Sequence, residues 1–193
     1  MASLDLERGF VYVPTLGLHV AKGRILQGKD WFESHKELQS QGSRMPTIPE
    51  FVEFLKYTKS NLPDVYEDIT EVRSPWRGEW LDADFKVISG VLHINYNHIL
   101  DSNGNLVPEN SEPLDEDTLM QDRRISLDSW LNNPTGQGLP RKDVDKGELH
   151  YWNPRRDDNS VARFVAGHDK ADLGWGRVPS VRISDLGVRA VRR

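Results

Sequence analysis

The sequence predicts an α+β protein in which two helices pack on a small mixed or antiparallel sheet with long loops. Helical spacing of apolar residues is confined to residues 30–61, whereas strand patterns and turn residues dominate from residue 80 onward. The chain has 193 residues, of which 37% are hydrophobic, and this is enough for one sizeable core but marginal for two. We therefore expect a single domain over residues 1–193.

The composition excludes several classes of site and partner. Cysteine is absent, which removes disulfides, thiolate zinc sites and thiol catalysis. The formal net charge of -5 is mild, so we expect no nucleic-acid partner. No apolar run approaches the roughly 18 residues of a membrane span, and the charged residues 1–8 lack the apolar core of a signal peptide. We expect neither a membrane span nor a signal peptide, and the composition leaves the cellular location open.

The N-terminal part combines a strand region with a first helix. Residues 10–20 mix β-branched and aromatic residues with glycine and proline, which predicts one or two short strands. Asp30 can cap a helix running to about Gln41, and Gly42 supplies the stop. One stripe of this helix is expected to face the core, and it consists of Trp31, His35 and Leu38.

A second helix follows at once. Thr47 and Glu50 have the T-x-x-E spacing of a capping box, in which each side chain binds a free amide of the first turn. The apolar face is expected to pack in the core, and it consists of Phe51, Phe54, Leu55 and Thr58. Asn61 and Pro63 are expected to end the helix.

Strands are expected from Trp80 to Leu106. Residues 87–96 are rich in β-formers, and residues 101–105 read Asp-Ser-Asn-Gly-Asn, a strong turn signal between apolar flanks. A β-hairpin is therefore predicted here.

Loops and short strands are expected beyond this hairpin. Residues 107–122 carry six acidic residues and no lysine or arginine, which favours a solvated acidic insertion loop. Residues 132–147 are also expected to be loop. From Leu149 onward, short apolar pieces alternate with glycine, proline and polar residues, which predicts short strands joined by long turns.

Two patterns suggest metal sites, and neither has the usual spacing. Asp101, Asn103 and Asn105 resemble part of a calcium loop, but glycine is fourth where an EF-hand needs it sixth, so a plain turn is favoured. His93 and His98 are five positions apart, which places their rings on opposite faces of one strand. We expect no metal, and no calcium or zinc requirement for folding.

Catalytic motifs are also missing from the sequence. Asp82 and Asp84 share one face of a possible strand, and paired carboxylates can perform acid–base chemistry, but such pairs arise by chance among 30 acidic residues. The chain has no nucleophile elbow, Walker loop, dinucleotide fingerprint or H-E-x-x-H. We expect no catalysis and no cofactor; the alternative is a metal-dependent enzyme that uses His93 or His98 with carboxylates.

Two short phrases near opposite ends of the chain carry a family resemblance. Arg44-Met45-Pro46-Thr47 followed by Glu50-Phe51 is similar to the phrase R-L-P-T-x-x-E-[WF], which opens the second helix in one branch of the C-type lectin fold. Residues 187–192, Gly-Val-Arg-Ala-Val-Arg, are similar to that branch's closing strand, G-[FV]-R-[LV]-x-R. The branch contains formylglycine-generating enzymes and the variable proteins of diversity-generating retroelements.

The resemblance implies different functions in different members of the fold. Formylglycine-generating enzymes use cysteines, which this chain lacks. Sugar-binding C-type lectins chelate calcium through E-P-N or Q-P-D together with W-N-D, whereas here Trp152-Asn153 is followed by Pro154 and neither tripeptide occurs. The resemblance therefore points to the variable proteins, whose C-terminal region binds a ligand.

In those proteins, adenines of a template repeat are copied with errors into the 3′ end of the gene. Asn codons are the usual targets, and randomising the two adenines of an AAC codon cannot produce Glu, Gln, Met, Lys or Trp. Residues 1–150 contain 12 Glu, 5 Gln and 3 Met, whereas the last 43 residues contain none of the three. Trp152, Lys170 and Trp175 would then belong to the scaffold or derive from other codons.

The resemblance thus implies a scaffold over residues 1–150 and a variable ligand-binding region over residues 151–193. Asn, Ser and Gly provide adaptable hydrogen bonds, and Tyr, Trp and Arg provide contact area. The expected ligand-binding residues are Tyr151, Asn153, Arg155, Arg156, Asp157, Asp158, Asn159, Ser160, Arg163, Asp169, Trp175, Arg177, Ser180 and Arg182. The expected partner is a protein or cell-surface ligand; a phage-associated or structural assembly module is a further alternative.

Three structural expectations follow from these interpretations. Residues 48–60 should be helical, and residues 187–192 should form a strand of the central sheet near the N-terminal strand, so that the termini lie close together. The polar residues of the stretch 153–160 should be mostly exposed and should cluster with Trp175 and Arg177 on one face; they are Asn153, Arg155, Arg156, Asp157, Asp158, Asn159 and Ser160. Tyr151-Trp152 on one side and Val161 on the other should anchor this segment in the core.

Overall fold

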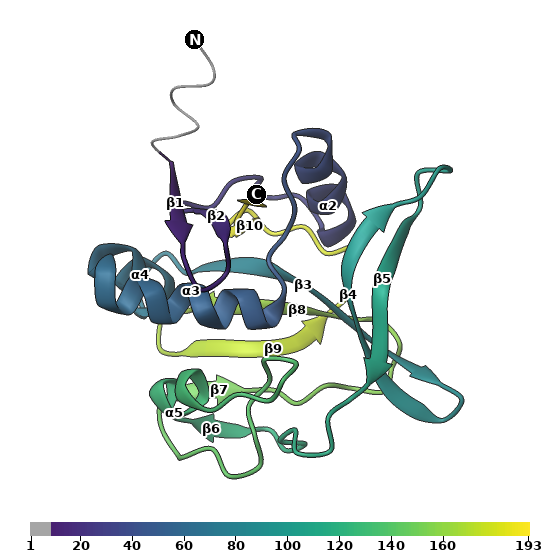
Figure 1. Ribbon diagram of the computed structural model, residues 1–193. Coiled ribbons are helices and arrows are strands. Elements are labelled where there is room, and N and C mark those ends of the chain that lie inside the picture. The colour runs from purple at the N-terminus through teal and green to yellow at the C-terminus, as the bar shows by residue number, and fades with distance from the viewer. Residues whose placement is uncertain (1–8) are drawn as a thin grey trace.

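The computed structural model describes residues 9–193, apart from the side chain of Arg177 and the burial of Gly176. The charged N-terminal segment, residues 1–8, lies outside the described residues. The described chain is an α+β structure with two sheets, and the helices lie between and beside them (Figure 1).

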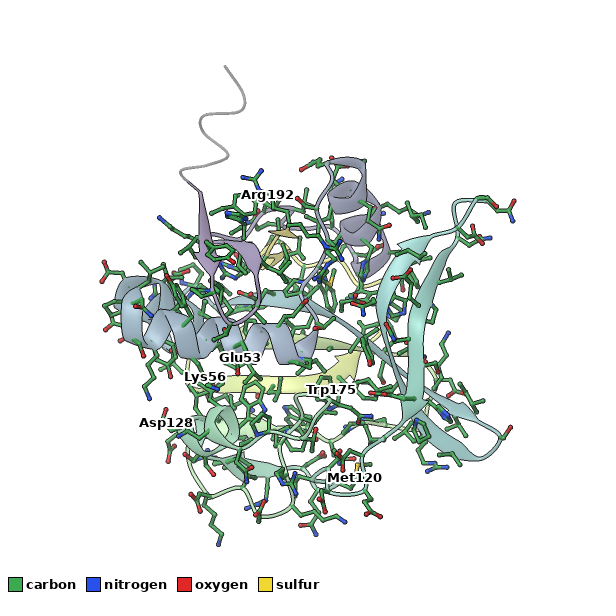
Figure 2. The ribbon with its side chains drawn as sticks, in the orientation of Figure 1. Glu53, Lys56, Met120, Asp128, Trp175 and Arg192 are labelled. Carbon is green, nitrogen blue, oxygen red and sulfur yellow. The ribbon has the colours of Figure 1, made fainter. Side chains whose placement is uncertain are left out.

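The two ends of the described chain meet in a small sheet. Strand β1 (Phe10–Val13) pairs antiparallel with β2 (Leu18–Ala21), and β2 pairs antiparallel with β11 (Val191–Arg192). The Arg192 guanidinium lies 4.1 Å from the centre of the Phe10 ring. The predicted short N-terminal strands and the proximity of the last strand are therefore confirmed for the described residues (Figures 1 and 2).

The two predicted helices are present and begin at the predicted caps. Helix α2 (Trp31–Ser40) starts after Asp30, and α3 (Ile48–Asn61) starts after Thr47 with a capping box to Glu50. Glu50 also accepts two hydrogen bonds from the Arg44 guanidinium, at 2.6 and 2.7 Å. This salt bridge explains the spacing of the arginine and the glutamate in the R-M-P-T-x-x-E phrase.

Two further short helices were not predicted. Helix α4 (Pro63–Thr70) begins at the proline that the sequence analysis takes as a stop. Proline is tolerated in the first turn, because the N–H that it lacks would have no helical partner there. Helix α5 (Leu127–Asn132) is only six residues long and is capped by the Ser126 side chain.

The larger sheet has the order β5-β4-β3-β8-β9-β7-β6, with β10 also pairing with β3. Its strands are β3 (Arg77–Ile88), β4 (Val91–Leu100), β5 (Leu106–Pro113), β6 (Arg123–Ile125), β7 (Leu149–Tyr151), β8 (Ser160–Ala166), β9 (Ala171–Arg177) and β10 (Leu186–Val188). The pairs are antiparallel except β10 with β3 and β7 with β9. The predicted hairpin with its turn at residues 101–105 is confirmed as β4–β5.

The expectation of an acidic loop over residues 107–122 is wrong in its first half. Residues 106–113 form β5, which pairs with β4 along its whole length. Strand β5 is the edge of the sheet, and most of its residues are exposed, so acidic side chains there stay hydrated and also oppose pairing with another chain. Charge alone therefore does not distinguish a solvated edge strand from a loop.

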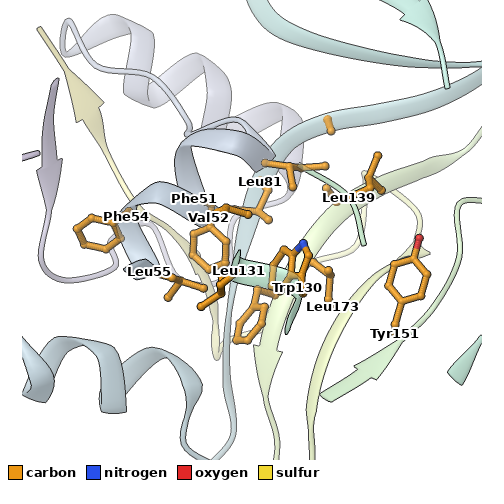
Figure 3. Close-up of a cluster of buried hydrophobic side chains, with 14 of the residues drawn as sticks. Phe51, Val52, Phe54, Leu55, Leu81, Trp130, Leu131, Leu139, Tyr151 and Leu173 are labelled. Carbon is orange, nitrogen blue, oxygen red and sulfur yellow. The ribbon is translucent and has the colours of Figure 1, made fainter. Parts of the chain in front are cut away.

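The core lies where α3 packs on the middle of the larger sheet (Figure 3). Phe51 of α3 contacts Phe164 of β8 with 5.4 Å between ring centres, and Trp130 of α5 stacks on the same ring at 6.4 Å. All three rings are buried, as are Phe54 and Leu55. The predicted core face of the second helix is confirmed.

The expected single strand over residues 187–192 is two short strands in two different sheets. Strand β10 pairs parallel with β3, and β11 pairs with β2. A Cβ on Gly187 would lie 2.8 Å from the Ile25 carbonyl oxygen, so this close backbone approach requires glycine. Arg189, between the two strands, is fully buried.

Arg189 makes a buried ion pair that joins the two sheets. Its Nε and Nη2 donate to the two oxygens of Glu79 at 2.9 Å each, and its Nη1 donates to the Ala21 carbonyl at 2.7 Å. The guanidinium also lies over the Phe54 ring. The bidentate pairing compensates for removing both charges from water.

Replacing Arg189 with alanine should therefore destabilise the protein by about 3–5 kcal/mol, because Glu79 would keep a buried charge without its partner. Denaturant melts would measure the loss. The exposed Arg193→Ala variant is the matched control and should change stability by less than about 0.5 kcal/mol. Equal losses in the two variants would contradict the structural role assigned to Arg189.

Candidate functional site

A polar loop, residues 153–159, joins β7 to β8, and we call it the recognition loop. Its five residues from Arg155 to Asn159 are all exposed, whereas Tyr151 before it and Val161 after it are each 1% exposed. The loop is thus held in the core at both ends, as predicted. Its exposed middle matches the expectation for this stretch.

The recognition loop is docked on residues 87–91, the tip of the β3–β4 hairpin. Asp158 accepts a hydrogen bond from the Val87 amide at 2.6 Å, and Arg156 donates to the Gly90 carbonyl at 2.5 Å. At the start of the loop, the backbone and side-chain amides of Asn153 both donate to Asp122. These contacts give the loop a defined position on the sheet.

Internal hydrogen bonds fix the shape of the loop. Asp157 accepts from the Ser160 hydroxyl at 2.7 Å and from the Asn159 amide at 3.2 Å. These hydrogen bonds, with that of Ser160 the strongest, hold the pKa of Asp157 below its usual value. Asp158 has φ +57°, a left-handed conformation that Asp and Asn adopt more readily than most residues.

The surface around the loop combines charges with apolar groups. Arg155 and Arg156 lie beside two acidic residues of the loop, and the hairpin tip adds Ile88 and Val91, which are 43% and 48% exposed. Charged groups that orient a partner and apolar groups that lose water on contact together suit a binding surface.

Three of the expected ligand-binding residues are buried, which corrects the sequence analysis. Trp175 is fully buried and packs 4.9 Å from the Phe85 ring (Figure 2). Tyr151 is 1% exposed and donates its hydroxyl to the Leu119 carbonyl, and Ser160 is 3% exposed. Alternation along a strand places one side chain in the core for each side chain outside, and composition does not show which face is which.

The expected ligand-binding residues that lie outside the recognition loop do not gather at one place. Asp169 lies in the turn between β8 and β9, at the opposite end of β8 from the recognition loop. Ser180 is exposed in the segment after β9, and Arg182 in that segment forms an ion pair with Glu33 of α2. Arg163 is half-buried on β8, and the Arg177 side chain lies outside the described part of the chain.

Trp152 is half-buried, so the expectation that it anchors the loop in the core is wrong. Its Nε1 donates to Asp172 at 3.2 Å, and the ring lies across β9 at Gly174, where an added Cβ would be 2.9 Å from the indole. Tyr151, the other residue expected to anchor this end of the loop, is buried.

A buried cluster of His35, Asp82 and His98 was missed by the sequence analysis as a unit. Asp82 Oδ1 lies 2.5 Å from His98 Nδ1 and 3.6 Å from His35 Nε2. On the other side of its ring, His98 Nε2 lies 3.5 Å from Asp84 Oδ1. His93, the other histidine considered, is not in this cluster; its Nδ1 lies 3.0 Å from the Val91 carbonyl.

A β-bulge and an amide clamp position the cluster. The register of β3 with β8 shifts between Trp80 and Asp84, which frees the Asp82 amide to donate to Pro46. The Gln39 side chain of α2 donates to the His98 carbonyl and accepts from the Leu100 amide. This clamp holds α2 against β4 and so brings His35 to His98.

The two histidines of the cluster titrate in opposite directions. Burial alone lowers the pKa of His98, but hydrogen bonds and charges of Asp82 and Asp84 outweigh it and raise the pKa to about 9. Burial dominates at His35 and lowers its pKa to about 4, against the attraction of Asp82. At neutral pH, His98 is therefore protonated and His35 is neutral in the metal-free protein.

Comparisons of the chain with protein-family models, curated proteins and solved structures find no match. Within residues 9–193, none of the helices combines the length and the apolarity needed to cross a membrane.

The stability contributed by these histidines should depend on pH in both directions. The His98 contribution is complete below the unfolded pKa of 6.5 and is lost as pH rises through about 9. The His35 contribution is lost as pH falls from 6.5 towards about 4, because the unfolded chain takes up the proton first. Urea melts with a chelator present would measure both limbs. The His98→Gln variant should lose the alkaline limb, and the His93→Gln control should keep it; an unchanged alkaline limb in His98→Gln would contradict the assignment.

The burial difference between two tryptophans gives another stability test. Trp175→Ala should cost about 3–5 kcal/mol, as expected for a buried aromatic residue. Trp152→Ala should cost about 1–2 kcal/mol, because Trp152 is only partly buried. Denaturant melts of both variants would measure the two losses, and a greater loss for Trp152→Ala than for Trp175→Ala would contradict the burial assigned to the two residues.

Proposed function

We propose that this protein is a non-catalytic binding protein that recognises a protein or cell-surface ligand through the recognition loop and the adjoining hairpin tip. The observation that carries the proposal is the run of five exposed residues from Arg155 to Asn159 between two buried anchors. Such a loop is presented in one conformation, which reduces the entropy lost on binding.

The side chains of the loop suit recognition more than catalysis. Arg155 and Arg156 provide charge and contact area, and Asn159 provides adaptable hydrogen bonds. The neighbouring Ile88 and Val91 add apolar surface. Within the described residues, the only grouping of three or more potential metal ligands is the buried cluster, which is too enclosed to receive a substrate.

We further propose that the chain has a C-type lectin fold and is a variable protein of a diversity-generating retroelement. Two observations support this proposal. The last strand returns to the N-terminal hairpin, and both phrases of the family resemblance have structural roles here, through Arg44–Glu50 and Arg189–Glu79. The absence of Glu, Gln and Met from the last 43 residues supports variation in this region.

The binding proposal can be tested with a loop variant and a matched control. Arg155→Ala/Arg156→Ala removes two exposed cations from the loop, and Lys22→Ala/Lys36→Ala removes two exposed cations elsewhere. Arrays of purified glycans and cell-surface proteins would be probed with the wild type and both variants. We expect saturable binding that weakens at least about tenfold, or about 1.4 kcal/mol, in the loop variant only.

Stability should change by less than about 1 kcal/mol in both of these variants, because the substituted residues are exposed. Equal binding by the wild type and the loop variant, with loss in the control, would refute the assigned surface. The retroelement proposal has a separate test in the genome. It requires a near-copy of the DNA for residues 151–193 beside a reverse-transcriptase gene, with differences at adenines of that copy, and its absence would refute that part.

A further inference from the structure

The buried cluster contains polar atoms that the protein itself leaves unpaired. His35 is fully buried, yet neither of its ring nitrogens has a hydrogen-bond partner. Asn95 Oδ1, at the edge of the cluster, is also buried without a hydrogen-bond partner, and Asp84 Oδ1 has only the 3.5 Å contact with His98 Nε2. Leaving a polar atom buried without a hydrogen bond is unfavourable, and an apolar side chain at position 35 would avoid this on the apolar stripe of α2.

We propose that His35, Asp82 and His98 form a binding site for a divalent transition-metal ion such as Zn²⁺. One ligand atom from each residue lies within 4.8 Å of the other two, and the three residues come from α2, β3 and β4. Zinc binds imidazole nitrogens and carboxylate oxygens at about 2.0–2.2 Å. Small side-chain rotations around a central ion would bring all three atoms to that distance.

The chemistry of the ligands selects the class of metal. Two imidazoles and one carboxylate suit zinc and other first-row divalent ions, whereas calcium and magnesium prefer sites made entirely of oxygen. A divalent ion also balances the charges of Asp82 and Asp84. The ion would also bind His35 Nε2, which otherwise has no hydrogen bond and only the 3.6 Å contact with Asp82.

Asp84 supplies the outer partner that a ligating histidine usually has. If His98 binds the ion through Nδ1, its Nε2 faces Asp84 Oδ1 at 3.5 Å. A carboxylate there fixes the orientation of the ring and increases its basicity. Asp84→Asn should therefore weaken metal binding without removing a ligand.

The ion would connect elements that are otherwise joined by few polar contacts. Helix α2 is held to β4 by the Gln39 clamp and to β3 by the hydrogen bond from Trp31 Nε1 to the Leu81 carbonyl. The ligands are at most 5% exposed, so the site is assigned a stabilising role and not a catalytic one. This inference is independent of the recognition loop and reverses the expectation that no metal stabilises the fold.

The test is metal titration of the full chain after removal of metals with a chelator. Calorimetry with Zn²⁺, and the visible absorption of bound Co²⁺, should show one ion per chain. Thermal melts should show stabilisation by Zn²⁺ and none by Ca²⁺. The absence of stoichiometric Zn²⁺ binding, or stabilisation by Ca²⁺ in its place, would overturn the proposal.

Three variants make the test specific. His35→Leu keeps the apolar stripe of α2 intact and should weaken Zn²⁺ binding at least about 100-fold, whereas Asp84→Asn should weaken it about 10–100-fold. The control is His93→Ala/His168→Ala, which removes two imidazoles outside the cluster and should bind like the wild type. Wild-type affinity in both His35→Leu and Asp84→Asn would overturn the assignment. If His35→Leu does not fold, the proposal is tested by the Zn²⁺ affinity of Asp84→Asn and by the number of Zn²⁺ ions bound per wild-type chain.

Discussion

The buried ion pair of Arg189 with Glu79 is the constraint on which the arrangement of the two sheets depends. An arginine without contact with water needs acceptors for its donors, and here they come from Glu79 on β3 and from the backbone at Ala21 and Lys22. These acceptors belong to different sheets, so satisfying one side chain fixes the small sheet on the large one. The chain passes from β10 to β11 at this residue, because its side chain must reach both.

Strand β3 organises the rest of the molecule along its length. Glu79, near its start, holds the ion pair with Arg189; Asp82, at the bulge, holds the histidine cluster; and Val87, near its end, binds the recognition loop. The bulge separates these functions, since it turns the segment around Asp82 away from the β8 ladder and towards α2. One strand therefore connects the core, the proposed metal site and the proposed binding surface.

Local signals in the sequence predict local structure, and they do so well here. The caps at Asp30 and Thr47 and the turn at residues 101–105 depend on neighbouring residues, and each is present as predicted. Pro63 is different, since the same residue can stop one helix or open the next, and the choice depends on how α4 packs. Trp175 is of a residue type that is common in recognition surfaces, and only the pairing of β9 shows that it lies in the core.

The histidine cluster shows why a site made from distant elements escapes sequence analysis. His35 and His98 are on a helix and a strand, and the sequence predicts each element without predicting that Gln39 clamps one to the other. His93 and His98 are close in sequence and so suggest a pair, although strand geometry separates them. A histidine on the core stripe of α2 is the available signal, because an apolar residue would be expected at that position.

The contacts of the recognition loop also indicate which of its positions can vary. Asp157 and Asp158 fix the turn and the docking through their side chains, so substitutions there would alter the conformation of the loop. Arg155 and Asn159 are exposed, and Arg156 binds only the Gly90 carbonyl on the hairpin tip, as another long donor could. The amino-acid composition is compatible with variation over the whole of residues 151–193. The structure is compatible with variation at only a few positions of the recognition loop. Because the buried anchors and the turn are separate from these positions, the proposed binding surface can change there without loss of the fold.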